Sequence, residues 1–161
     1  MVSSASIWKL LDEVPDPEIP VLSVVDLGIV RSVNVIDEKN IAVVVTPTYS
    51  GCPAVKAIEN SIREKLIECG FEPSITTSLS PAWNTDWITE RGRERLKAYG
   101  IAPPVDEVDK NVLFADAPVV PCPRCNSSNT RMISQFGSTA CKAHYQCNEC
   151  LEPFDYFKCL K

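Results

Sequence analysis

Histidine is nearly absent from this sequence, which argues against several kinds of enzyme. His144 is the only histidine among 161 residues, so a serine–histidine or cysteine–histidine hydrolase is a poor fit. No glutamate precedes it at the ExxH spacing of carboxylate-bridged di-iron sites. The six glycines do not form the GxGxxG fingerprint of a dinucleotide-binding loop. We expect His144 to be a strand residue rather than a metal ligand.

Long apolar runs and a basic stripe are missing as well. No stretch approaches the roughly 18 apolar residues that a membrane-spanning helix needs, and Met1 to Leu11 lacks the pattern of a secretory signal. The sequence therefore predicts a soluble, cytoplasmic protein that does not enter a membrane. The net charge is −5, and the lysines and arginines are scattered, so a nucleic-acid partner is not expected.

Cysteine, by contrast, is abundant and clustered. The chain has eight cysteines, of which six follow residue 121. In a reducing cytoplasm such a cluster indicates metal ligands or reactive thiols rather than disulfides.

The first 100 residues predict a small two-layer α/β domain of the α+β kind. Apolar periodicity and turn residues predict, in order, a helix over 5–14, a hairpin of strands over 29–36 and 41–46, a helix from Pro53 to Gly70, a strand over 73–79 and a helix over 86–99. Residues 101–120 are acidic and contain prolines, so they are interpreted as a linker or an extended strap, in which Val112, Leu113 and Phe114 could dock. Residues 121–161 form the second module.

Two cysteine knuckles define this second module. Cys122 and Cys125 are separated by two residues, as are Cys147 and Cys150, and 21 residues lie between the pairs. Two such knuckles complete a tetrahedral four-sulfur site, which suits zinc or, alternatively, iron. About 40 residues with little core need such a site to fold. The sequence therefore predicts a zinc-ribbon-like β module.

Two further cysteines of this module, Cys141 and Cys159, have two interpretations. They could be small apolar residues of the ribbon strands. They could instead be extra ligands, either for a second, transient metal or in place of a knuckle cysteine, or one of them could carry a persulfide.

Cys52 is the candidate thiol of the first domain. It lies in TPTYSGCP, directly before the predicted helix, where the helix dipole is expected to lower its pKa and make it a nucleophile or a soft-metal ligand. The alternative is a capping residue without chemistry. Asp16 and Glu18 are either loop caps or acids placed near Cys52. Cys69 falls on the apolar stripe of the same helix and is expected in the core.

Those stretches carry a family resemblance. DPEIPVLSVVDLGIV (16–30) and TPTYSGCPA (46–54) resemble the metal–sulfur cluster assembly domain family, and the whole chain, with its cysteine-rich end, resembles the D subunits of the phenylacetyl-CoA 1,2-epoxidase system. The resemblance implies a non-catalytic maturation factor that helps to assemble an iron–sulfur or di-iron centre. It also implies that Cys52 is the functional thiol, that Asp16 and Glu18 are the family's acid pair, and that the oxygenase and reductase subunits are partners. We expect Cys52 to take iron, sulfur or a cluster transiently.

Two other functions remain open from the residues alone. Iron in the knuckles would make the chain a rubredoxin-like electron-transfer component. Zinc in the knuckles, with Cys52 as a bystander, would make it an interaction module without chemistry.

Overall fold

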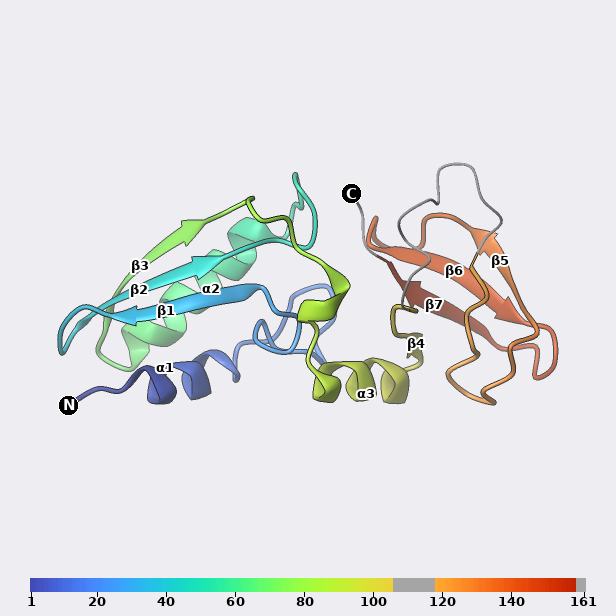
Figure 1. Cartoon of the computed structure of the whole chain (residues 1–161), viewed down its shortest axis with the longest axis horizontal. Coiled ribbons are helices and arrows are strands. Elements are labelled where there is room, and N and C mark those ends of the chain that lie inside the picture. The colour runs from blue at the N-terminus through green and yellow to red at the C-terminus, as the bar shows by residue number, and fades with distance from the viewer. Residues whose placement is uncertain (106–117, 159–161) are drawn as a thin grey trace. The chain divides into compact units, whose positions relative to one another are not determined.

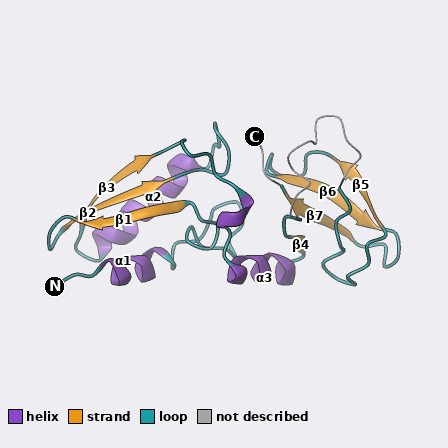
Figure 2. Ribbon diagram, in the orientation of Figure 1, coloured by secondary structure: helices purple, strands orange, loops and turns teal. Residues whose placement is uncertain are grey.

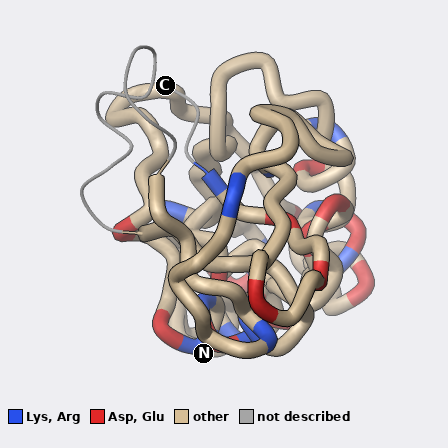
Figure 3. The backbone as a smooth tube through the Cα atoms, turned by 90° about the vertical axis from the view of Figure 1, so that its right-hand side faces the viewer, with Lys and Arg blue, Asp and Glu red and all other residues tan. Residues whose placement is uncertain are grey.

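The computed structural model describes residues 1–105 and 118–158, and the chain divides into two compact units, Met1–Gly92 and Arg93–Lys161. Figures 1 and 2 show the helices and strands of each unit, and Figure 3 shows basic and acidic positions interspersed along the backbone. No described helix combines the length and the hydrophobicity needed to cross a bilayer. The α+β class predicted from the sequence is confirmed.

The first unit contains a three-stranded sheet of mixed direction. Strands β1 (Val30–Val35) and β2 (Asn40–Val45) pair antiparallel, and β3 (Glu72–Thr77) pairs parallel to β2. A parallel pair needs a long crossover, which α2 (Val55–Glu68) supplies along one face of the sheet. Helix α1 (Ser4–Leu11) contacts β1 and α2.

Alternating residues of the strands and one stripe of each helix form the core of the first unit. The side chains on the inner face of the sheet and those of the helix stripes are all buried: Val33, Ile41, Val43, Val45, Ile7, Leu11, Ile58, Ile62 and Leu66. The helical spacing in α2 therefore identified the buried positions Ile58, Ile62 and Leu66 correctly.

Two sequence predictions about the helices of this region are wrong. Cys69 is exposed, because α2 ends at Glu68 and Cys69 becomes its C-cap, while Gly70 closes the helix with φ +87°. The helix predicted over 86–99 is interrupted. A short 3₁₀ turn, η1 (Thr85–Trp87), is followed by extended backbone, and α3 spans Glu90–Tyr99. Thr89 donates its backbone N–H to the Asp26 carbonyl, so tertiary contacts outweigh the local helix preference.

The second unit contains a four-stranded sheet in the order β4-β7-β6-β5. Its strands are β4 (Ile101–Ala102), β5 (Thr130–Ser134), β6 (Lys142–Cys147) and β7 (Pro153–Phe157). All neighbours pair antiparallel except β4 and β7, which are parallel. Ile101 and Ala102 therefore belong to the sheet, although the sequence assigned them to the linker. The docking predicted for Val112, Leu113 and Phe114 lies outside the described residues.

One face of this sheet forms the core of the second unit. Tyr145 stacks on Phe154 with ring centroids 5.8 Å apart and meets Tyr156 edge-on at 5.6 Å. The core also includes two knuckle cysteines, Cys122 and Cys147. The metal-ligand candidates are thus part of the core itself.

Candidate functional site

Each knuckle is a tight turn that closes on a residue in the left-handed conformation. In the first turn, the Asn126 N–H donates to the Cys122 carbonyl at 2.8 Å, and Asn126 has φ +62°. In the second turn, the Cys147 N–H donates to the Glu152 carbonyl at 3.0 Å, and Leu151 has φ +65°. In both turns the left-handed residue stands four positions after the first cysteine, so the two turns present their cysteine pairs in the same way.

The structure brings the four knuckle sulfurs together. The Sγ atoms of Cys122 and Cys150 are 3.7 Å apart, those of Cys125 and Cys147 are 3.5 Å apart, and all four lie within 4.8 Å of one another. A zinc–sulfur bond of about 2.3 Å implies sulfurs about 3.8 Å apart in a tetrahedron. The spacing therefore fits a single four-coordinate metal ion, and the four cysteines form a metal-binding group.

The thiols of this group do not share one pKa. Backbone N–H groups of Cys150 and Glu149 lower the pKa of Cys147 to about 7. For Cys150 the N–H of Glu152 lowers the pKa, but burial and the sulfurs of Cys125 and Cys147 outweigh it and raise the pKa to about 12. Close thiolates repel one another, so some of the four cysteines keep their protons when no metal is bound. A metal ion binds thiolates and must displace these protons. Metal affinity is therefore expected to fall as the pH falls.

Cys141 is not part of this group. Cys141 is buried in the turn just before β6, with its Sγ 3.0 Å from the Thr139 hydroxyl, so it is a core residue beside a ribbon strand rather than in one. Cys159 lies outside the described residues. His144 is on β6, and its Nδ1 is 3.4 Å from a carboxylate oxygen of Asp155 on β7.

Cys52 lies just before α2, in the loop that follows β2. The thiol is buried, and the backbone N–H of Ala54 and the hydroxyl of Tyr49 both hydrogen-bond to it. Helix α2 begins at Val55, with Ala54 as its N-cap, so Cys52 precedes the first helical residue by three positions.

The prediction that the helix dipole lowers the pKa of Cys52 is wrong. Burial raises the pKa of this thiol, and the negative charges of Glu18 and Asp16 raise it further, while the donors Ala54 and Tyr49 act in the opposite direction without prevailing. Desolvation disfavours a thiolate more than two hydrogen bonds favour it here. At neutral pH the group is therefore a thiol.

Asp16 and Glu18 lie close enough to Cys52 to influence its charge, but they do not form a compact ligand set with it. Asp16 is buried, and its Oδ1 accepts hydrogen bonds from the N–H groups of Glu18 and Ile19, both at 2.9 Å. Among the described residues, the knuckle cysteines are the only group in which three or more such donors lie within 4.8 Å of one another. Asp16 therefore acts as a turn cap and as a nearby negative charge.

Sequence reasoning missed the role of residues 83–91, which hold the loop Asp26–Gly28 (the DLG loop) in place. The fully buried carboxylate of Asp26 accepts hydrogen bonds from Thr89 Oγ1 at 3.0 Å and from Arg91 Nε at 2.8 Å, and Arg91 also pairs with Asp12. The indole of Trp83 donates to the Leu27 carbonyl at 2.7 Å. Thr89 and Arg91 fall in the helix predicted over 86–99, and neither they nor Trp83 carry a local signal of these distant partners.

The raised pKa predicts a pH dependence for Cys52 alkylation. Iodoacetamide reacts with the thiolate, so modification of Cys52 should be slow at about pH 7 and should accelerate through the alkaline range. Removing one negative charge by Glu18→Gln should lower the pKa and speed the reaction at a given pH. Mass spectrometry of the peptide that contains Cys52 measures both rates. Glu64→Gln, on the exposed side of α2, is the matched control, and a rate already maximal at neutral pH would contradict the prediction.

The comparisons with known proteins agree with this two-part organisation. Residues 4–70 match the family described as "Iron-sulfur cluster assembly protein", and residues 106–158 match the "PaaD zinc beta ribbon domain". A crystal structure of a domain of unknown function, DUF59, from Bacillus anthracis has the fold of the first unit. It has a TM-score of 0.54 and 23% identity, and the match covers 58% of this chain and 90% of that one.

Two curated relatives are similar in sequence. A protein of Porphyromonas gingivalis (strain ATCC BAA-308 / W83), named an Fe-S protein maturation auxiliary factor, is 35% identical over 56% of this chain and 87% of its own length. A protein of Escherichia coli (strain K12), named as the D subunit of a 1,2-phenylacetyl-CoA epoxidase, is 52% identical over 96% of this chain and 92% of its own length. The chain therefore belongs to the family of phenylacetyl-CoA epoxidase D subunits, in which an iron–sulfur cluster assembly domain precedes a zinc β-ribbon.

Proposed function

We propose that this chain is an accessory maturation factor of a multicomponent phenylacetyl-CoA epoxidase, and that Cys52 transiently holds iron, sulfur or a cluster during assembly. The observation that carries the proposal is the separation of its thiols into two sites with different chemistry. Four sulfurs form a complete ligand set in the ribbon, whereas a single buried thiol lies in the assembly domain.

The four-sulfur group is suited to a structural role. Four thiolates occupy every position of a tetrahedral ion, so no position is open for a substrate or for cargo. We propose zinc as the resident ion, because it prefers this geometry and the family is described as a zinc ribbon. Its role is then to fold a unit whose core contains two of the ligands, Cys122 and Cys147.

Cys52 is suited to transient binding. A protonated, buried thiol is inert towards most reagents, but an approaching cation favours the thiolate and displaces the proton. The hydroxyl of Tyr49 and the N–H of Ala54 would then donate to the sulfur, while Asp16 and Glu18 would attract a positively charged metal. Iron, sulfur or a cluster that is held by a single protein thiol can be transferred easily. The proposed recipients are the oxygenase and reductase subunits of the epoxidase.

Loss of the Cys52 thiol is expected to abolish maturation without unfolding the chain. Cys52→Ala removes one sulfur next to an exposed loop, so far-UV circular dichroism and the zinc content should stay at wild-type values. Epoxidase activity in a pathway reconstituted from purified components should fall by about tenfold or more, the scale expected when a ligand or nucleophile is lost.

The control for this experiment is Cys69→Ala, which removes an exposed cysteine from the same unit and should leave activity unchanged. Full epoxidase activity with Cys52→Ala would refute the proposal. Elemental analysis and an absorption spectrum of anaerobically purified protein separate the alternatives. About one zinc per chain without visible bands supports a structural site, whereas iron that persists in Cys52→Ala supports electron transfer through the knuckles.

A further inference from the structure

We propose that the outer edge of β5 binds an acidic, extended segment of a partner protein, which adds to the ribbon sheet as a further strand. The inference concerns the second unit alone and does not depend on the chemistry of Cys52. It rests on three observations, namely the position of β5 in the sheet, the apolar side chains that it exposes and the distribution of charge around it.

Strand β5 is the last strand of its sheet. It pairs with β6 on one side, from Thr130 opposite Cys147 to Ser134 opposite His144. Among residues 1–105 and 118–158, no strand pairs with its other side. The N–H and C=O groups along that side can therefore accept an added strand, which is the basis of peptide recognition by sheet edges.

Large apolar side chains are exposed on β5 and just after it. Met132 is 40% exposed, Ile133 50% and Phe136 57%. The register of β5 against β6 shifts between Met132 and Ser134, so Ile133 stands at a β-bulge and has no partner residue on β6. Single exposed apolar residues are ordinary, but two on an edge strand and a third, Phe136, two residues after it form a surface that proteins usually protect with charge or cover.

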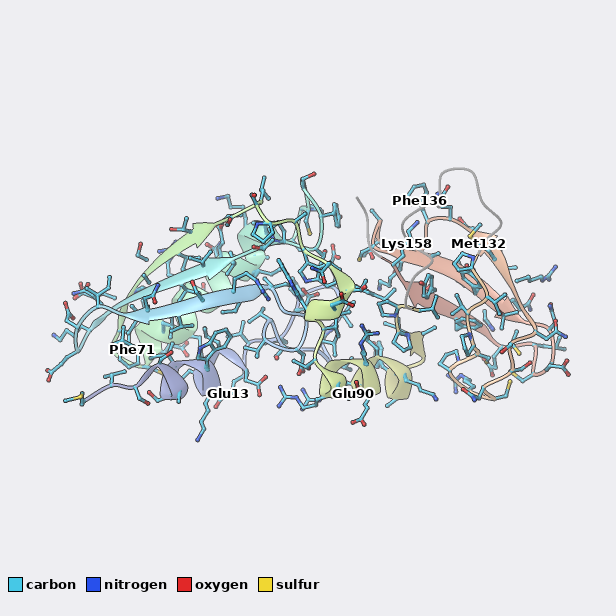
Figure 4. The ribbon with its side chains drawn as sticks, viewed as in Figure 1. Glu13, Phe71, Glu90, Met132, Phe136 and Lys158 are labelled. Atoms are coloured by element: carbon cyan, nitrogen blue, oxygen red, sulfur yellow. The ribbon has the colours of Figure 1, made fainter. Side chains whose placement is uncertain are left out.

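Two cations, Arg131 and Lys158, lie near this edge, and the carboxylate of Glu149 is bound by the Asn129 amide just before the strand. No aspartate or glutamate occurs between residues 117 and 148. Arg131, on β5, donates to the neutral amide oxygen of Gln146 at 2.7 Å. Lys158 lies with its Nζ 4.3 Å from the centre of the Phe136 ring, and Figure 4 shows Met132, Phe136 and Lys158 in the same part of the ribbon.

These observations together specify the partner chemistry. An added strand must supply backbone hydrogen bonds and place apolar side chains next to Met132 and Ile133. Acidic residues at its alternate positions would face Arg131 and Lys158, because opposite charges steer association and fix the register. A basic segment would be repelled by the same two cations. The surface should therefore bind acidic segments in preference to basic ones.

The test uses a fluorescent decapeptide of alternating valine and glutamate as the probe, and the lysine version of that peptide for comparison. We expect the glutamate peptide to bind zinc-loaded wild-type protein about tenfold more tightly than the lysine peptide, and more weakly as salt is raised. Ile133→Lys and Arg131→Glu should each weaken its binding by about tenfold. Hydrogen exchange should show that the amides of 130–134 become protected when the peptide binds.

The matched control is Ile36→Lys, which places the same charge at an apolar position of the first unit that is 66% exposed and should not change binding. Zinc content and far-UV circular dichroism establish that each variant is folded. Equal binding of the two peptides, or unchanged binding by folded Ile133→Lys, would overturn the proposal. Protection confined to residues of the first unit would instead identify a different surface and would also overturn it.

Discussion

Substitution of Cys147 by serine is expected to empty the four-sulfur site and to unfold the second unit. Cys147 supplies one of the four sulfurs and also lies in the core beside Tyr145. Binding of structural zinc contributes about 10–16 kcal/mol in small zinc domains, which exceeds the stability of most small domains. The packed rings of Tyr145, Phe154 and Tyr156 should lose their fixed environment. The tyrosine bands of the near-UV circular dichroism should therefore collapse together with the zinc content, while the tryptophan bands of the first unit remain.

Cys69→Ser is the control, because it removes a cysteine of the first unit that lies outside the four-sulfur group. It should retain both the zinc and the near-UV signal. Wild-type protein treated with a strong chelator should resemble Cys147→Ser, and amide resonances of the first unit should persist in both. Normal near-UV signal in zinc-free protein would mean that the ribbon core is stable without its metal.

Replacement of Gly28 by alanine is expected to destabilise the first unit by about 3–5 kcal/mol, a value at the high end for single substitutions. Gly28 has φ +68°, and a Cβ there would lie 2.4 Å from the Trp87 carbonyl oxygen and 2.6 Å from the Trp87 Cβ. The nearest atom is backbone, so relief requires η1 to move away from the DLG loop. Urea unfolding monitored by tryptophan fluorescence measures the loss.

Gly70→Ala separates the effect of the clash from that of the backbone conformation. Gly70 has φ +87°, yet nothing lies within 4 Å of the position that a Cβ would take there. The substitution should therefore cost only about 1 kcal/mol, the usual penalty for a left-handed alanine. Equal losses for the two variants would show that the contact with Trp87 contributes nothing.

Features set by short sequence spacing were predictable. The two-residue gaps of the knuckles determine a turn that points both sulfurs the same way, so the grouping of Cys122, Cys125, Cys147 and Cys150 followed from the sequence alone. The strands and α2 followed from apolar periodicity for the same reason. In each case the decisive interaction links residues that are near one another in the chain or repeat at a fixed period.

Features set by distant contacts were not predictable. The pKa of Cys52 depends on its burial and on the charges of Glu18 and Asp16, neither of which can be read from its position before a helix. The break before α3 depends on the contact of Thr89 with Asp26, across 63 positions. Local preference was overruled in both cases by partners that only the folded chain brings close.

The short strand β4 determines how the ribbon can be used as a building block. Ala102 is buried in the ribbon core with Val120 and Cys122, although the similarity to the zinc ribbon family begins only at residue 106. A fusion or a transplanted ribbon that starts at that family boundary would lack this core side chain and the parallel partner of β7. The transferable module is therefore longer at its N-terminal end than its cysteines suggest, and a ribbon grafted onto another protein has to carry this extra stretch with it.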